Sequence, residues 1–443
     1  MNAKTLYTLV AVAVLALIAV FAINRSNRPE SDISDQAKPL LSQLHGHVND
    51  VSAITLTGAD NKVLATLKRG SDGWSVAEKS GYPADLAKIR EFLLKLDAAT
   101  LIEVKTSNPK HYADLGVGDV EKCGQGRPPS DSGDQGGSQK CGILVDITGL
   151  TQPLKLIVGN FNGAGGGGTF VRLEGQEQSW LAKGNLSVAK NIADWEKRDL
   201  ADIAASRLKS VTLTNPDGKV LKVYKEQSAD SNFKVADVPK GRETSSEFAA
   251  NGLGSTLATL KADDVFAAKD AVPADKVYKA EYAAFDGLVV EAIGWTKDGK
   301  DYAQFTAKLD TAAAGAQIAS AQAKAKSDYD AAVLAANKAA MDDKSTADKQ
   351  AAAKVTAAGE VAKPLPVSDP TRDRQDKLDA LNKEVAELNK TFAGWSYVLP
   401  NFTFSNISKS MDDMLKPLEA KKPETKDANK PAAAKPPAKP AGK

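Results

Sequence analysis

Hydrophobic and polar residues alternate in two segments of the chain that carry nearly the same sequence. Residues 53–64 read AITLTGADNKVL, and residues 210–221 read SVTLTNPDGKVL. Alternation with a period of two predicts β-strands, and the Gly, Asn, Asp and Pro residues in the middle of each segment predict a turn. Each copy continues to an aromatic residue, Trp74 or Phe233, and then to a stretch with helical spacing. The repetition predicts two related modules, each beginning with a β-hairpin.

The first module continues with one predicted helix and four predicted strands. The helix begins near residues 83–85, and its apolar face consists of Leu86, Ile89, Phe92, Leu93 and Leu96. The strands are expected at residues 142–148, 154–158, 169–173 and 178–181. A helical stretch is expected to close the module, with Trp195, Leu200 and Ile203 as its apolar residues. The predicted helix at residue 86 and beyond should cover a small sheet.

The second module repeats this pattern until an insertion interrupts it. Its predicted helical face consists of Phe248, Leu253, Leu257 and Leu260, and its strands are expected at residues 287–293 and 302–309. Residues 311–361 are rich in Ala, Lys, Asp and Gln, and a second helix is expected at residues 371–390. That helix repeats apolar residues at the heptad spacing typical of a coiled coil: Leu378, Leu381, Val385 and Leu388. We expect a helical hairpin here, with this stripe packed within the hairpin or against a partner, and our hypothesis is that it faces a partner.

These patterns predict an α+β protein with two modules of mostly antiparallel sheet and helix. The expected divisions are an anchor and stalk (1–36), a first module (37–205), the first part of a second module (206–310), the helical insertion (311–390), the closing part of the second module (391–416) and a tail (417–443). The tail is rich in Lys, Pro and Ala, a composition typical of disorder. Its lysines would also suit contact with anionic lipid or wall polymers.

The N-terminus contains one long apolar run. Residues 6–23 carry no charge, and as a helix they are long enough to cross about 30 Å of hydrocarbon. The alternative is a cleaved secretory signal with residues 20–22 as its cleavage site, but the length of the run favours an uncleaved anchor. Basic residues flank the run on both sides, so charge does not set its orientation. A short stub before a single anchor favours export, which predicts a single-pass inner-membrane protein with its bulk in the periplasm.

Composition adds little to this picture. The 443 residues are 42% hydrophobic, which suffices for packed cores, and a formal net charge of +2 gives no reason to expect nucleic acid as a partner. The two cysteines, Cys123 and Cys141, flank one polar loop. In an oxidising compartment a disulfide between them would stabilise the fold by roughly 3 kcal/mol. The alternative is a pair of free thiols, since a metal site would need further ligands.

Candidate chemistry is sparse. The glycine-rich stretch from Gly159 to Gly168 has no Lys-Ser or Lys-Thr after it and lies between two predicted strands, so it predicts a hairpin tip rather than a phosphate-binding loop. The chain has only three histidines, His45, His47 and His111, which are too few and too scattered for a metal site. There is no nucleophile elbow. We therefore expect no catalytic residues, no metal and no cofactor, and predict that the protein is not an enzyme.

Several short motifs in the two modules resemble a known family. In the first module they are Val48-Asn49-Asp50-Val51, Ile54-Thr55-Leu56, Trp74, Phe92-Leu93-Leu94-Lys95-Leu96, Tyr112-Ala113-Asp114-Leu115-Gly116-Val117, Leu156-Ile157-Val158-Gly159 and Phe170-Val171-Arg172. They continue with Ala193-Asp194-Trp195, Arg198-Asp199-Leu200 and Gly394-Trp395-Ser396-Tyr397-Val398-Leu399-Pro400. The chain thereby resembles domain-of-unknown-function family 4340 (DUF4340) over most of residues 40–310 and 391–416. The motifs are structural markers, and no catalytic residue comes with them.

The resemblance implies a role through gene neighbourhood. Genes of this family commonly neighbour those of a gliding-motility-type ABC transporter and its auxiliary subunit. The resemblance therefore implies a membrane-anchored, extracytoplasmic accessory or scaffold subunit, with the transporter permease and the auxiliary subunit as partners. The alternative hypothesis is an envelope protein that binds glycan or lipid in the cleft between the modules. An envelope hydrolase is a third class, and the missing chemistry counts against it.

Overall fold

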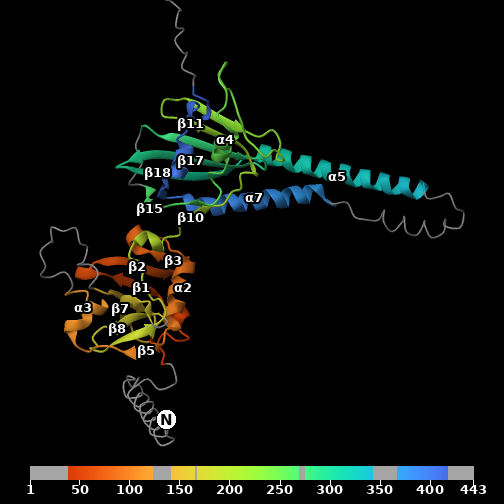
Figure 1. The fold of residues 1–443 in the computed structure, drawn as a ribbon. Coiled ribbons are helices and arrows are strands. Elements are labelled where there is room, and N and C mark those ends of the chain that lie inside the picture. Colours follow the sequence, from red (N-terminus) through yellow and green to blue (C-terminus); the bar gives the residue numbers. More distant parts are fainter. Residues whose placement is uncertain (1–37, 123–140, 165–166, 269–274, 343–366, 418–443) are drawn as a thin grey trace, which may run out of the picture.

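The protein forms two lobes joined by a short connector, and each lobe is built on one large antiparallel sheet (Figure 1). The computed structural model describes residues 38–122, 141–164, 167–268, 275–342 and 367–417. The first lobe comprises residues 38–195, the connector residues 196–198, and the second lobe the described residues from 199 onwards. The prediction of an α+β fold is confirmed.

The first lobe contains a nine-stranded antiparallel sheet in the order β4-β3-β2-β1-β6-β7-β8-β9-β5. Its strands are β1 (Ala53–Thr57), β2 (Val63–Gly70), β3 (Gly73–Val76), β4 (Tyr82–Pro83), β5 (Leu101–Val104), β6 (Ile143–Thr148), β7 (Leu154–Asn162), β8 (Gly168–Leu173) and β9 (Ser179–Lys183). The helix α2 (Leu86–Asp97) covers one face, and Asp85 caps it by accepting a hydrogen bond from the Lys88 backbone N–H at 3.0 Å. The predicted hairpin and all four later strands of this module are present.

The second lobe contains an eight-stranded sheet in the order β13-β12-β11-β16-β17-β18-β19-β15. Its strands are β11 (Leu208–Thr214), β12 (Val220–Tyr224), β13 (Lys234–Val235), β15 (Asp264–Ala267), β16 (Tyr278–Ala284), β17 (Leu288–Lys297), β18 (Lys300–Leu309) and β19 (Trp395–Val398). Helices α4 (Glu247–Gly254) and α8 (Asn401–Ile407) pack on its core face. A two-stranded sheet, β10 (Asp199–Ala201) with β14 (Leu260–Lys261), lies beside the connector.

The two sheets have the same strand order apart from the additional edge strand β4. In the first, the central hairpin pairs Thr57 with Val63, and in the second Thr214 pairs with Val220 at the corresponding positions of the repeated sequence. A further antiparallel strand, β6 or β16, follows on the other side of each hairpin. This agreement in register makes it possible to compare the lobes position by position.

Several elements differ from the sequence-based expectation. The helix expected to contain Trp195, Leu200 and Ile203 does not form: Trp195 ends a short 3-10 helix (Ile192–Trp195), and Leu200 lies in β10. Leu86, predicted on the buried face of α2, is 51% exposed, and Phe248 in α4 is 85% exposed. Helical spacing identifies the direction of a face but not how far the sheet extends beneath it. The end of the predicted face, Leu260, lies in strand β14 because it pairs with Ala201 of β10.

Two helices, α5 (Thr311–Asp342) and α7 (Pro370–Phe392), lie between β18 and β19 in the chain and project from the second lobe (Figure 1). We call this pair the arm. The Gln322 side-chain amide joins the helices by donating hydrogen bonds at 2.8 Å to the Pro370 carbonyl and to Asp373. At its base the Asn389 side chain accepts from the Ala307 N–H at 2.8 Å and donates to the Ala307 carbonyl at 2.7 Å. The arm is therefore fastened to β18.

Several sequence-based predictions concern residues outside the described part of the chain. These are the apolar run at residues 6–23, Cys123 of the predicted disulfide, and the tail from residue 418. Within the described ranges, no helix combines the length and the apolar character needed to cross a bilayer.

Candidate functional site

The connector, together with Trp195 before it, forms backbone hydrogen bonds with both lobes. On the side of the first lobe, the Asp85 N–H donates to the Trp195 carbonyl at 2.8 Å and the Lys197 N–H donates to the Pro83 carbonyl at 2.9 Å. On the side of the second lobe, the Ala262 N–H donates to the Arg198 carbonyl at 2.9 Å. Backbone pairing on both sides leaves little freedom in φ and ψ, so the connector is a structural joint rather than a loose linker.

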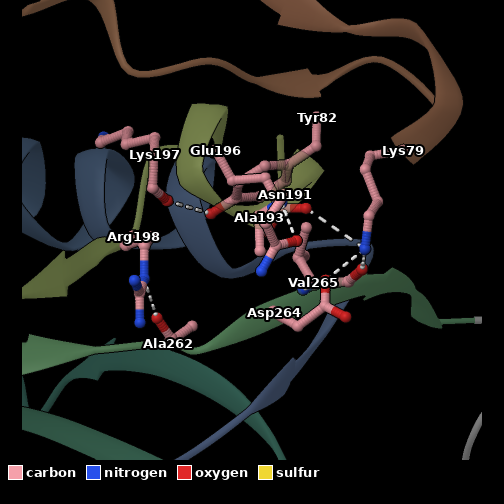
Figure 2. A network of polar contacts seen from close by, with 10 residues as sticks. All are labelled: Lys79, Tyr82, Asn191, Ala193, Glu196, Lys197, Arg198, Ala262, Asp264 and Val265. Carbon is pink, nitrogen blue, oxygen red and sulfur yellow. Dashed lines mark hydrogen bonds and ion pairs between the residues drawn. The ribbon is translucent and has the colours of Figure 1, made fainter. Parts of the chain in front are cut away.

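A buried cluster of three charged side chains lies at this joint (Figure 2). Lys79 comes from a 3-10 turn of the first lobe (Ala77–Lys79), Glu196 from the connector and Asp264 from β15. The Lys79 ammonium forms an ion pair with Asp264, lies 3.2 Å from Glu196 Oε1 and donates to the Val265 carbonyl at 3.1 Å. Lys79 is 13% exposed and Glu196 is 2% exposed. One cation is therefore shared between two carboxyl groups that are held largely out of water.

Burial makes Glu196 the unusual acid of this cluster. Desolvation raises its pKa to about 7, the neighbouring Lys79 opposes that shift, and the charge of Asp264 adds to it. Glu196 Oε1 has no hydrogen bond of normal geometry among the described residues and depends on the ion pair alone. A carboxyl group with a pKa near neutrality can hold or release a proton under physiological conditions. In this arrangement the group is closed off from solvent, so its titration would act on the joint and not on a substrate.

Tyr82 makes the apolar contacts that join the two lobes. It belongs to β4 of the first lobe, yet its ring is buried in the hydrophobic core of the second lobe. It meets Trp395 edge to face at a centroid distance of 4.9 Å and Tyr397 at 6.3 Å. Its hydroxyl donates to the Lys197 carbonyl at 2.8 Å, and burial raises the pKa of the phenol. The lobes are thus joined by an interpenetrating core together with a buried ion-pair cluster.

A second group of polar and aromatic residues covers the outer face of the first sheet, opposite α2. The short helix α3 (Tyr112–Leu115) and the loop after it pack on Leu144 and Ile157. Arg172, which is buried, donates from Nε to the Val117 carbonyl at 3.0 Å, lies over the Tyr112 ring at 4.5 Å and pairs with Asp119. Three of the short family motifs, those with Tyr112, Ile157 and Arg172, therefore meet in one packed cluster.

Gly159 explains why one of those motifs ends in glycine. A Cβ atom at this position would lie 2.5 Å from the Leu115 carbonyl oxygen and 2.9 Å from that of Gly116. Only a residue without a side chain lets the covering loop come this close to β7. The glycine-rich stretch that begins here ends in the turn between β7 and β8, as the sequence predicted, with Asn162 paired to Gly168.

The residues singled out for chemistry in the sequence have ordinary surroundings. His47 and His111 are exposed and lie near Asp50 and Asp114, at 2.8 Å and 3.3 Å. His45 lies 3.3 Å from Asp97. Among the described residues no group of three or more His, Cys, Asp and Glu side chains could hold a metal ion. Cys141 is half-buried and bridges to Gly118 through the backbone, while its predicted partner lies outside the described ranges.

The four residues of the predicted partner-facing stripe lie in different surroundings. Val385 and Leu388 pack against the core of the second lobe, near the base of the arm. Leu378 and Leu381 lie further out along α7 and are half-buried. The base of α7 is also held by Glu384, which forms two hydrogen bonds with Arg207 at 2.6 and 2.8 Å. The inner half of the stripe thus serves attachment to the lobe, and only its outer half lies along the projecting part.

Sequence reasoning did not identify Lys79, Glu196 or Asp264 as a site. Glu196 stands in the charged run Glu196-Lys197-Arg198-Asp199, which looks like solvated surface. Lys79 and Asp264 are 185 residues apart in the chain. The only sequence signal near the joint was the pair of short motifs around Trp195 and Arg198, which flank Glu196 on both sides.

Comparison with known proteins adds a family but no function. Neither the curated proteins nor the solved structures gave a match. One family model, described as a domain of unknown function (DUF4340), matches residues 74–288. The matched segment begins in β3 and ends at the start of β17, so it includes Lys79, Tyr82, Glu196 and Asp264 and spans the joint between the lobes. Residues 74–288 of this chain therefore belong to the DUF4340 family.

Proposed function

We propose that this protein is a non-enzymatic accessory or scaffold subunit of an ABC-type transport system of the gliding-motility kind. In this proposal residues 6–23 anchor it in the inner membrane as a single-pass helix, and the two lobes lie in the periplasm. Its partners would be the transporter permease and the auxiliary subunit. The observation that carries the proposal is the arm, a pair of helices that leaves the body of the protein and yet is rigidly attached to it.

The attachment of the arm supports a role in protein contact. α5 has 32 residues and so extends for about 48 Å along its axis. At the base, Arg207 links the arm to the lobe by contacting Glu384 of α7 and, at 2.6 Å, Asp286. Further out, Leu334 of α5 is exposed. A projection that stabilised only its own lobe would need no such length, since the inner turns already make those contacts.

The buried charged side chains at the joint contact one another, and this supports a non-enzymatic role. Lys79, Glu196 and Asp264 face one another across the joint and so contribute to holding the lobes together. The alternative function, binding of glycan or lipid in a cleft between the modules, has less support because Tyr82 and Lys79 fill the junction.

The proposal is tested by affinity purification of the full-length protein in mild detergent, with mass spectrometry of the proteins that come with it. We expect the permease and its ATPase with the intact protein. We expect their loss from a variant in which residues 326–368 are replaced by a short Gly-Ser linker, because this deletion leaves the base of α5 and α7 in place. Unchanged circular dichroism of the lobes is the control. Purification of the intact protein alone, or full retention of partners by the shortened variant, would refute the proposal.

A further inference from the structure

The outer face of the second sheet contains an open groove. It has a volume of about 540 Å³. Side chains of β11, β16, β17 and β18 form its floor, including Thr214, Lys279, Ile293, Gln304 and Thr306. The residues that follow α7, up to Trp395, form one edge. The opposite face of the same strands is the hydrophobic core of the lobe, which α4, α7 and α8 cover.

The common register shows which residues of the first lobe correspond to this floor. In the first sheet Thr57 pairs with Leu144, Leu144 with Ile157, and Ile157 with Arg172. In the second sheet Thr214 pairs with Lys279, Lys279 with Ile293, and Ile293 with Gln304. Because Thr57 and Thr214 are equivalent in the repeated hairpin, the two series are equivalent residue by residue.

In the first lobe a segment of the chain itself covers this series. Residues 106–120 lie on it, with Tyr112, Val117 and Val120 packed against Leu144 and Ile157. Polar bonds fix the segment at both ends. Arg172 donates to the Val117 carbonyl, and the Ser179 hydroxyl donates to the Thr106 carbonyl at 2.7 Å. The outer face of the first sheet therefore binds a polypeptide segment, residues 106–120.

Among the described residues, no segment of the second lobe forms such a cover. In the first lobe the cover belongs to the connection between β5 and β6, residues 105–142, whereas the equivalent connection in the second lobe, between β15 and β16, is only residues 268–277. The corresponding floor is left accessible, and Ile293 at its centre is 37% exposed.

The charges of the groove indicate the chemistry of an occupant. Glu281 and Glu291 lie directly opposite each other, and Lys308 is 3.8 Å from the first and 2.5 Å from the second. Lys279 replaces the apolar Leu144 of the first lobe, and among the described residues it forms no ion pair and no side-chain hydrogen bond. The groove thus presents one unpaired cation beside one exposed isoleucine. An acidic residue close to an apolar one would satisfy both.

We propose that this groove binds a polypeptide segment of a partner protein, with an Asp or Glu paired to Lys279 and a neighbouring aliphatic or aromatic side chain on Ile293. The partner segment takes the place that residues 106–120 fill in the first lobe. Gln304, which now donates to the Ser396 hydroxyl at 2.9 Å, occupies the position from which Arg172 binds a backbone carbonyl. This inference goes beyond the proposed function, because it requires neither the arm nor a transporter.

The test places the photo-crosslinking residue p-benzoylphenylalanine at Thr306 of the full-length protein in its native membrane. Irradiation should give a polypeptide adduct whose crosslinked peptide contains Asp or Glu within four residues of an aliphatic or aromatic residue. Lys279→Glu and Ile293→Arg should each lower the yield at least tenfold, and Lys279→Arg should retain it. The matched control places the same crosslinking residue at Glu174, the equivalent position of the first lobe. Glu174 lies opposite Lys155 in the first sheet as Thr306 lies opposite Glu291 in the second. Irradiation of this control should give only a background yield of adduct.

Four results would overturn the proposal: no polypeptide adduct, an adduct that neither substitution weakens, a crosslinked peptide without an acidic residue, or an adduct with glycan or lipid alone. Thermal unfolding of each variant shows whether the lobe is intact. Where Lys279→Glu lowers the melting temperature, Lys279→Gln replaces it as the charge-removing variant. The arm is unaltered in all these variants, so their outcome is independent of the purification with the shortened arm.

Discussion

The two lobes share one strand order but differ in whether the outer face of the sheet is covered. In the first lobe both faces of the sheet are covered, one by α2 and the other by residues 106–120. In the second lobe the core face is covered, the outer face contains an open groove, and an arm extends from the strand next to it. The comparison teaches that the differences between the lobes lie in what is inserted between equivalent strands. The segment between β5 and β6 closes this surface in the first lobe, whereas the insertion of the second lobe lies between β18 and β19 and forms the arm.

The largest expected effect concerns the joint that holds the lobes together. Tyr82→Ala should lower the free energy of unfolding by about 4 kcal/mol, because it removes a buried ring from the core of the second lobe and leaves a cavity beside Trp395 and Tyr397. Tyr82→Phe loses only the hydrogen bond to the Lys197 carbonyl and should cost about 1 kcal/mol. Urea unfolding followed by tryptophan fluorescence measures both. Equal effects of the two substitutions would mean that the ring does not join the lobes.

The next prediction compares equivalent positions on the two outer faces. Arg172→Met should lower stability by about 3 kcal/mol, because it leaves the Val117 carbonyl and Asp119 without their buried partner. Gln304→Met, at the equivalent position of the open groove, should cost less than about 1 kcal/mol. Denaturant titration of both variants gives the difference. A larger loss for Gln304→Met would contradict the distinction between a closed and an open face.

The cover of the first lobe can also be lifted directly. Gly159→Ala should destabilise the protein by about 2 kcal/mol, since its Cβ would collide with the Leu115 and Gly116 carbonyls. The control is Gly70→Ala in β2, where a Cβ would meet nothing closer than the Gly73 carbonyl at 3.8 Å. Hydrogen exchange should show faster exchange of residues 112–120 in the first variant only. Unchanged protection there would mean that the close approach is not needed for the cover.

The last prediction is a dependence of stability on pH, of about the same size, that arises at the joint between the lobes. The pKa of Glu196 is about 7 in the folded protein and 4.5 in the unfolded chain, so the folded state binds this proton more tightly. Stability should therefore fall as pH rises from about 4.5 to 7, by on the order of 2 kcal/mol, and stay low above that.

Glu196→Gln should flatten this dependence, whereas the exposed Glu103→Gln should leave it unchanged. Thermal unfolding from pH 4.5 to 8 measures the three proteins. A wild-type curve that rises through this range would contradict the assignment, because it would require a carboxyl whose pKa is lowered on folding.

Local patterns predicted most of the individual elements correctly. The two hairpins, the strands from β6 to β9 and the buried face of α2 at Ile89, Phe92 and Leu96 follow from period-2 or helical spacing within a few residues. Strand β16, with the sequence YKAEYAA, was missed because alanine, lysine and glutamate have no preference for strands. It is a strand because β11 and β17 pair with it on both sides.

The site was less accessible to sequence reasoning than the fold. Arg172 and Tyr112 stand in motifs that the sequence analysis had marked, but their meeting on one face depends on the pairing of β7 with β8. Lys79 and Asp264 come from different lobes, and Glu196 lies in a charged run that predicts exposure. Nothing local in the chain distinguishes a buried glutamate from a solvated one.

By itself the sequence determined the repeat, the hairpins, the position of the helical insertion and the match of residues 74–288 to DUF4340, because each of these depends on the order of residues along the chain. The tertiary structure alone decided that Tyr82 enters the core of the other lobe, that Lys79 lies between Glu196 and Asp264, and that one outer face is closed while its counterpart is open. These outcomes depend on which distant segments meet. Burial and the pKa of a side chain follow from that meeting and not from the identity of the neighbours in the chain.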